Sequence, residues 1–337
     1  MAGTLHGFGL GVASKNANGD VLDVFYPAPL ANISGDLVSI FDGVSGELKA
    51  TEIRALSDGL RSAGEHALAD IAVRLGEADQ PVVASLLADN AAPQTVADAY
   101  LKLHLLSHRL IKPHGTDLTG MFALLPNVAW TDEGPIDLAE LADRQLTSRL
   151  KGRVLEVASV DKFPKMTNYV VPSGVRIAHT ARVRLGAYLG SGTTVMHEGF
   201  INFNAGTDGP GMIEGRISAG VMVGKGSDLG GGCSTMGTLS GGGNIIISVG
   251  ESCLLGANAG LGIPLGDRCT VEAGLFVTAG TKVTVLDDAR EAVETLAARH
   301  LSGQSDLLFR RNSQSGSVEC LTNQTAIELN ESLHDNN

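Results

Sequence analysis

A six-residue repeat limits how this chain can fold more than any other feature of its sequence. Aliphatic residues occupy every sixth position from Ile177 to Ile201. A second run keeps the same spacing from Ile217 to Val283 with mostly aliphatic or small residues, which are Ile217, Val223, Leu229, Thr235, Gly241, Ile247, Cys253, Ala259, Leu265, Val271, Val277 and Val283. A period of six residues is typical of a parallel β-helix, a solenoid of short flat strands in which three repeats form one triangular coil.

Glycine is unusually frequent, which supports tight and repetitive turns. The chain has 43 glycines among 337 residues, roughly double the usual share of about 7%. Many lie between repeat positions, and two runs, at 230–234 and 240–243, permit a ligand to approach the backbone closely. Collagen is excluded, because there are only 11 prolines.

The repeat is interrupted once and then ends. The step from Ile201 to Ile217 is sixteen residues, four more than two repeats. We therefore expect part of the segment 202–216 to leave the coil as a loop, the kind of segment that often carries function. Beyond Val283 the period stops, and residues 288–301 are compatible with a helix or with a connection to a further strand.

The N-terminal part follows other patterns. Apolar residues spaced by three and four predict one helix between Leu60 and Ala72 and another from Thr95 to Ile111. Asn16–Gly19 separates two short apolar runs and predicts a β-hairpin. We therefore predict three parts: a mixed α+β domain at 1–165, a β-helix at 166–285, and a C-terminal segment at 286–337.

Charge and cysteine content restrict the partners and the compartment. A formal net charge of -12 gives no general attraction to nucleic acid or to an anionic membrane. The first residues lack a signal-peptide pattern and no apolar stretch reaches about 18 residues, so we expect a cytoplasmic protein. The four cysteines form no CxxC pair, which predicts buried free thiols rather than a zinc site or disulfides.

Five short sequence segments, in their order along the chain and together with the six-residue repeat, resemble the long form of the tetrahydrodipicolinate N-succinyltransferase family. The resemblance covers nearly the whole chain. The segments that carry it are Tyr100–Arg109, Asp161–Met166, Val195–Phe200, Met212–Arg216 and Arg310–Ser313.

The resemblance implies a left-handed parallel β-helix and an acyltransferase of lysine and diaminopimelate biosynthesis. Succinyl-CoA would be the donor, the amine of tetrahydrodipicolinate the acceptor, and N-succinyl-2-amino-6-oxopimelate and CoA the products. It also implies a homotrimer with active sites shared between neighbouring subunits. Burial of the flat aliphatic faces of the coil favours such a closed assembly. An acetyl-CoA enzyme on the same acceptor and a non-catalytic scaffold remain alternatives.

The resemblance also suggests roles for individual residues. Glu214 matches the catalytic glutamate, which forms an acyl-anhydride or acts as a general base; the sequence leaves both open. Arg216 is suited to the succinyl carboxylate or a phosphate, because its guanidinium is a fork of donors. The remaining donor contacts implied by the resemblance are Gly231, Ser234, Ala257, Glu272, Ala273, Gly280, Arg310, Arg311, Asn312 and Ser313.

Two further suggestions concern the acceptor and a metal. Lys162 and Lys165 are candidates to meet the acceptor carboxylates, with solvated lysines beside a proline turn as the alternative. Glu198 matches a glutamate that in some relatives holds Mg²⁺ at the trimer axis. The position of its aspartate partner is Ala181 in this chain, and the neighbouring His197 is suited to a structural hydrogen bond.

Overall fold

The computed structural model describes residues 4–237 and 245–322, and the chain divides into two compact units. Of the described residues, the N-terminal unit holds 4–111, 115–164 and 168–170. The coil unit holds 112–114, 165–167, 171–237 and 245–322. The predicted repeat position Gly241 and the glycine run 240–243 lie outside the described residues.

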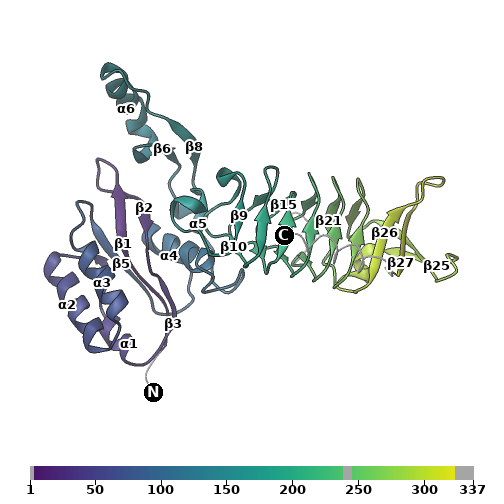
Figure 1. The fold of residues 1–337 in the computed structure, drawn as a ribbon, viewed down its shortest axis with the longest axis horizontal. Helices are drawn as coiled ribbons and strands as arrows, with labels where there is room; N and C mark the ends of the chain where they lie inside the picture. The colour runs from purple at the N-terminus through teal and green to yellow at the C-terminus, as the bar shows by residue number, and fades with distance from the viewer. Residues whose placement is uncertain (1–3, 238–244, 323–337) are drawn as a thin grey trace. The chain divides into compact units, whose positions relative to one another are not determined.

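The N-terminal unit is a mixed α+β domain around an antiparallel sheet of order β2-β1-β5-β4, with β3 also paired to β1 (Figure 1). Helices α2 and α3 pack on the face of Phe8 and Leu10, whereas a Cβ at Gly9 would meet Leu101 of α4 at 2.8 Å, so α4 covers the other face. The elements are β1 (Leu5–Lys15), β2 (Val21–Phe25), β3 (Leu30–Ile33), α1 (Asp36–Phe41), β4 (Gly46–Glu47), α2 (Ala50–Ser62), α3 (His66–Leu75), β5 (Val82–Leu87) and α4 (Val96–Ser107).

The hairpin and the second helix predicted in this unit are confirmed, and the first helix is partly wrong. Asn16–Gly19 joins the antiparallel strands β1 and β2. The predicted helix from Leu60 to Ala72 is instead the end of α2, a turn, and the start of α3. Gly64 in that turn has φ of +83°, a left-handed conformation that ends a helix and that glycine adopts without strain.

A smaller three-stranded sheet of order β7-β6-β8 completes the N-terminal unit. Its strands are β6 (Val128–Thr131), β7 (Gly134–Asp137) and β8 (Val157–Asp161), and α5 (Met121–Leu124) and α6 (Leu138–Leu150) flank them. Ala129, Ile136 and Leu155 form its buried core.

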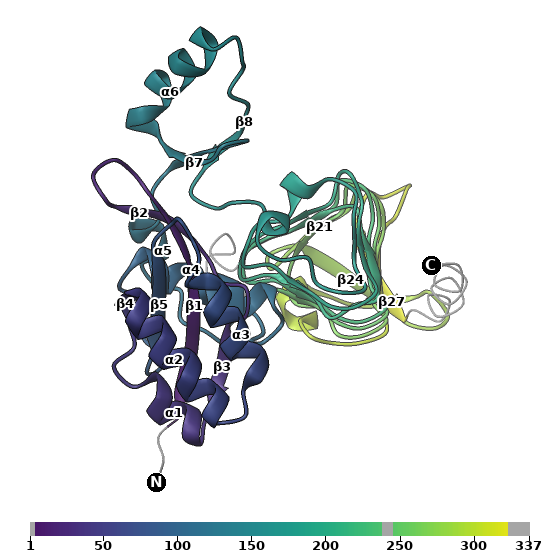
Figure 2. The ribbon, with the colours of Figure 1, turned by 60° about the vertical axis from the view of Figure 1, so that its left-hand side comes forward.

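The coil unit is a parallel β-helix with three sides, in which each strand pairs with a strand one coil further on (Figure 2). We call the sides sheet I, sheet II and sheet III. Sheet I contains β10 (Tyr188–Leu189), β13 (Gly206–Thr207), β16 (Met222–Val223) and β19 (Ser248–Val249). Sheet II contains β9 (Arg176–Ile177), β11 (Thr193–Val195), β14 (Gly211–Ile213), β17 (Asp228–Leu229), β20 (Leu254–Leu255) and β22 (Thr270–Val271). Sheet III contains β12 (Phe200–Ile201), β15 (Arg216–Ile217), β18 (Ser234–Thr235), β21 (Gly260–Gly262) and β23 (Phe276–Thr278).

The predicted repeat positions form the interior of this coil. Among the described residues, every predicted position from Val183 to Val283 is buried. Ile177, in the first strand of the coil, is half-buried. The fold therefore keeps a continuous apolar interior made of small and branched side chains.

The predicted loop at 202–216 is wrong. Ile201, Thr207, Ile213 and Ile217 each pair with residues of neighbouring coils, so the sixteen residues are two steps of six and one of four. The step of four residues in place of six comes from a shortened turn between β14 and β15, which contains only Glu214 and Gly215. The segment stays in the coil as β13, β14 and the start of β15.

The predicted register is also wrong, by two residues, at Ile247, Cys253 and Ala259, and it is right again at Val271 and Val277, which pair with the preceding coil. The positions that pair with the preceding coil are Val249, Leu255 and Leu261. The predicted positions Ile247, Cys253 and Ala259 are nevertheless buried. Side chains two residues apart along a strand point to the same face, so a slip of two keeps the residues inside.

The segment 288–301, left open by the sequence, contains a strand and no α-helix. Strand β25 (Ala292–Ala297) pairs antiparallel with β24 (Lys282–Leu286), and one 3₁₀ turn follows at Ala298–Leu301. Strands β26 (Leu307–Arg311) and β27 (Val318–Thr322) join sheet II, where β26 pairs with β22. The last strands thus extend one side of the coil.

The cysteines are buried free thiols, as the sequence predicts. Two of them stack on Ser227 inside the coil. The Cys253 amide donates to the Ser227 hydroxyl at 2.8 Å, the Cys269 amide donates to the Cys253 Sγ at 3.3 Å, and the Cys253 Sγ in turn donates to the Gly266 carbonyl at 3.1 Å. These side chains satisfy backbone groups that the turns leave without partners.

Among the described helices, none is long and apolar enough to cross a membrane.

The close stacking of coils predicts that Gly206→Ala destabilises the protein. A Cβ at Gly206 would lie 1.9 Å from the backbone oxygen of Tyr188 in the preceding coil, and overpacking of this kind costs about 1 to 3 kcal/mol. Differential scanning calorimetry should show a lower unfolding temperature. Gly280→Ala is the matched control, because no atom lies within 4 Å of that Cβ position. Equal unfolding temperatures for the two variants would contradict the packing of these coils.

Candidate active site

Most of the predicted site residues lie along one edge of the coil, where the chain turns from sheet II to sheet III. We call this the II–III edge. Successive turns stack on one another through backbone bonds, such as Asn258 N–H to Gly231 O at 2.9 Å and Gly274 N–H to Ala257 O at 2.8 Å. The predicted residues in these turns are Glu198, Glu214, Gly231, Ala257, Glu272 and Ala273, and Ser234 begins the strand that follows one of them.

The turn that holds Glu214 is shorter than its neighbours. It has two residues, whereas the turns before and after it on this edge have four. A Cβ on Gly215 would meet the Sγ of Cys233 and would lie 2.7 Å from the Cys233 carbonyl. Glycine at 215 is therefore required for the short turn to pack against the next coil.

Two carboxylates of successive coils face the same point on this edge. The Oε2 atom of Glu214 lies 3.6 Å, and that of Glu198 lies 3.7 Å, from the position of a Cβ on Gly231. Glu214 is half-buried and Glu198 is exposed. Among residues 4–237 and 245–322, neither carboxylate has a hydrogen-bond or ion-pair partner. Both oxygens are therefore available to a ligand, and the absent side chain at Gly231 leaves the space between them open.

The backbone fixes the position of Glu214 although its side chain is unengaged. Its amide donates to the Leu229 carbonyl at 2.8 Å, and its carbonyl accepts from Gly232 at 3.3 Å. An oriented carboxylate without an internal partner can remove a proton or attack an acyl carbon. The nearby Cys233 is unsuited to this role, because burial raises the pKa of its thiol to about 12.

Arg216 follows Glu214 by two residues and supplies positive charge beside it. It is exposed on β15 and pairs with Phe200 and Ser234 in the neighbouring coils. Within the described part of the chain its guanidinium has no partner. A guanidinium in this state can bind a carboxylate or phosphate through two parallel hydrogen bonds.

The C-terminal basic segment reaches the same edge. The Arg311 amide donates to the Glu272 carboxylate at 2.6 Å, and the Arg311 guanidinium donates to the Gly316 carbonyl at 2.9 Å. Arg310 forms an ion pair with Glu319 at 2.9 Å, and Asn312 donates to the same carboxylate at 2.7 Å. Arg310 is thus engaged within the chain, whereas Arg311 is exposed and makes a single side-chain contact.

Three predicted residues are not part of the II–III edge. Gly280 follows β23 at the opposite end of that strand. Lys162 belongs to the N-terminal unit, where its ammonium donates to the Phe122 carbonyl at 2.8 Å and to the Leu125 carbonyl. Lys165 belongs to the coil unit and lies opposite Arg184 in an antiparallel bridge. Ser313, the last of the basic segment, is exposed.

A magnesium site finds no support within one chain. Among the described residues, no group of three His, Cys, Asp or Glu side chains is arranged to hold a metal ion. Ala181, at the position of the second carboxylate, offers no ligand atom.

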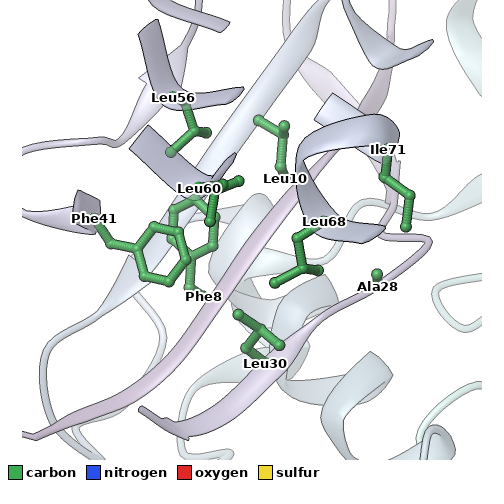
Figure 3. A pocket seen from close by; sticks show the side chains of 9 residues that line it. All are labelled: Phe8, Leu10, Ala28, Leu30, Phe41, Leu56, Leu60, Leu68 and Ile71. Atoms are coloured by element: carbon green, nitrogen blue, oxygen red, sulfur yellow. The ribbon is translucent and has the colours of Figure 1, made fainter. Parts of the chain in front are cut away.

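The apolar cavity in the N-terminal unit is not a substrate site. Its volume is about 20 Å³ and it lies between the sheet and helices α2 and α3 (Figure 3). Only apolar side chains line it: Phe8, Leu10, Ala28, Leu30, Phe41, Leu56, Leu60, Leu68 and Ile71. It holds one water molecule at most and offers no polar group to an anionic substrate.

A coil of hexapeptide repeats with an oriented carboxylate and basic groups along one edge fits the class of β-helix acyltransferases. Family models agree: "Hexapeptide repeat of succinyl-transferase" matches residues 246–279, and "Tetrahydrodipicolinate N-succinyltransferase middle" matches residues 125–165.

Whole-chain relatives identify the family. Proteins named 2,3,4,5-tetrahydropyridine-2,6-dicarboxylate N-succinyltransferase are 63% identical in Pseudomonas paraeruginosa, over 100% of both chains, and 58% identical in Vibrio cholerae, over 98% of both. A Campylobacter jejuni crystal structure, described as a putative 2,3,4,5-tetrahydropyridine-2-carboxylate N-succinyltransferase, superposes with a TM-score of 0.86 at 33% identity, covering 96% of this chain and 93% of that one. The chain belongs to the tetrahydrodipicolinate N-succinyltransferase family and is an acyltransferase.

The ion pair that orders the basic segment predicts a pH-dependent effect of Glu319→Gln. Hydrogen bonding by Asn312, together with Arg310, holds the pKa of Glu319 below its usual range. The stabilisation is therefore complete above the unfolded-state pKa and is lost as the pH falls through the lower folded-state pKa. We expect the variant to lose about 1 to 3 kcal/mol at pH 7. Thermal unfolding from pH 7 to pH 3 should show the difference from wild type shrinking towards acid; a constant difference would contradict this account.

Proposed function

We propose that this enzyme transfers the succinyl group of succinyl-CoA to the amine derived from tetrahydrodipicolinate, a step of lysine and diaminopimelate biosynthesis. The products are N-succinyl-2-amino-6-oxopimelate and CoA, with one water consumed as the ring opens. The observation that carries the proposal is identity of 63% over the full chain with proteins of that name. The oriented carboxylate on the II–III edge supports it independently.

We infer that Glu214 is the catalytic carboxylate. As a general base it takes the proton of the amine while the nitrogen attacks the thioester carbon and the thiolate of CoA departs. As a nucleophile it displaces the thiolate itself and forms an acyl-anhydride, which the amine then opens, regenerating the carboxylate. Both routes need an ionised carboxylate beside the thioester. The backbone bonds of Glu214 and the space over Gly231 support either one.

The donor is proposed to lie along the II–III edge. Gly231, Ser234, Ala257, Glu272 and Ala273 follow one another there over successive coils, and small residues let the pantetheine arm approach the backbone. Arg216, next to Glu214, is placed for the succinyl carboxylate. Gly280 is retained as a donor contact on resemblance alone.

The basic segment is the proposed site of the CoA phosphates. Arg311 is assigned the larger part, because it is exposed and its guanidinium makes a single hydrogen bond, to the Gly316 carbonyl. Arg310 is assigned a smaller direct share, since its charge is already paired with Glu319. Asn312 and Ser313 complete the segment, and Asn312 also shapes it by accepting from the Gln314 and Ser315 amides.

For the acceptor, Lys162 and Lys165 remain the proposed cations. Lys162 uses two of its three donors on backbone carbonyls, which orients the third. A cytoplasmic location is proposed from the four free buried thiols, which suit a reducing compartment. Left-handed winding of the coil is proposed from the hexapeptide pattern and the family resemblance.

The donor assay tests the function together with Glu214. With tetrahydrodipicolinate as acceptor, wild-type enzyme should release free CoA thiol from succinyl-CoA faster than from acetyl-CoA. Glu214→Gln keeps the size of the side chain and removes the nucleophile and the base, so turnover should fall on the order of 10²-fold or more. Calorimetric affinity for the donor should change little.

Two outcomes of this assay would overturn separate parts of the proposal. Preference of the wild type for acetyl-CoA would replace the donor assignment. Near-normal turnover by a folded Glu214→Gln protein would remove Glu214 from the chemistry while leaving the reaction intact.

We further propose a homotrimer in which neighbouring subunits share each active site. The aliphatic repeat positions are already buried inside the coil, but Ile246 and Phe276 are exposed on it. Burial of such apolar side chains favours a closed symmetric assembly, which the family resemblance also implies. Multi-angle light scattering at micromolar concentration should give three times the chain mass of 34.9 kDa. A monomer mass accompanied by full activity would refute the shared-site arrangement.

A further inference from the structure

A basic residue next to the first strand of sheet III lies near the catalytic turn and is not one of the site residues named above: Arg184, whose amide donates to the Ile201 carbonyl of β12 at 3.2 Å. Arg184, half-buried at the start of the coil, donates a hydrogen bond from its guanidinium to the Asn202 side chain at 3.2 Å. Its guanidinium carbon lies 5.9 Å from the centre of the Phe200 ring. These two contacts hold the guanidinium in one orientation, since a cation is attracted to the face of an aromatic ring.

Phe200 connects this position to the catalytic turn. Its amide donates to the Gly215 carbonyl at 3.0 Å, and the residue pairs with Arg216 in the next coil. Coils of a parallel β-helix are spaced by about 4.8 Å. Arg184 therefore lies within about two coils of Arg216 and of the turn that holds Glu214.

A second basic residue, Lys165, lies beside Arg184. Lys165 lies directly opposite Arg184 in an antiparallel bridge, and side chains of directly opposed residues are neighbours, with Cβ atoms about 5 Å apart. The chain as a whole carries a net charge of -12, so an anionic substrate must be held by local cations such as these.

The acceptor named for the relatives, tetrahydropyridine-2,6-dicarboxylate, is a six-membered nitrogen ring with carboxylates at positions 2 and 6. Its two negative charges need separate cations, and Arg216 is already assigned to the succinyl group. We propose that Arg184, with Lys165 beside it, binds a carboxylate of the acceptor and determines that this enzyme uses a dicarboxylate. Asn202 and Phe200 fix the guanidinium for that contact. This inference rests on the proposed function.

The test separates the two substrates kinetically. Arg184→Met keeps the aliphatic stem and removes the charge, and loss of a charge-assisted hydrogen bond corresponds to about 10- to 100-fold in binding. We expect KM for tetrahydrodipicolinate to rise by that factor while KM for succinyl-CoA stays within about twofold. Arg184→Lys should recover part of the loss. Arg176→Met is the matched control, an exposed arginine of the same coil on sheet II, and should leave both constants unchanged.

A second measurement uses the wild-type enzyme, so the proposal stays testable even if the Met variant does not fold. Piperidine-2,6-dicarboxylate should compete with the acceptor at least tenfold better than piperidine-2-carboxylate. Equal inhibition by the two analogues, an unchanged acceptor KM in Arg184→Met, or a rise in donor KM instead would each overturn the assignment. Absence of succinyl transfer in wild type would instead refute the proposed function itself.

Discussion

Parallel backbone hydrogen bonds between successive coils determine where every functional side chain of the coil unit lies. Each strand is only two or three residues long in most of the coil, too short to be stable alone. Its position is therefore fixed by the strand before it and the strand after it. Glu214, Gly231 and Ala257 stack along one edge because their strands pair in this way.

This dependence explains which parts of the fold the sequence predicts. A buried aliphatic residue at every sixth position is required by the coil, so the β-helix and its interior follow from periodicity. Periodicity does not distinguish residues two apart that face the same side, which is why it predicts Cys253 at the repeat position that Leu255 occupies. It also does not show a shortened corner, so the two missing residues at Glu214–Gly215 were interpreted as a loop.

The candidate site was predictable to a similar depth. Its residue types and order were identifiable from short segments that resemble the family. The structure brings Glu214, Gly231, Ala257 and Glu272 onto one edge of the coil. Contacts that depend on which strands pair, and in which register, were not predictable from residue types and order. The pairing of Arg310 with Glu319 requires β26 and β27 to lie side by side, and the contact of Arg184 with Phe200 requires the coil register. The first contact neutralises Arg310, which the sequence suggests for phosphate binding, and the second orients Arg184, which the sequence does not single out.

The two-residue turn at Glu214 also shows how such a coil can acquire chemistry. The strands before and after it keep their partners, so two residues are absent at one corner without displacement of the neighbouring coils. The turns at the corners of the coil can thus change without altering the strand pairing in the three sheets that hold the coils together. In such an architecture, evolutionary change in the reactive groups can occur one corner at a time, while the apolar interior continues to support folding.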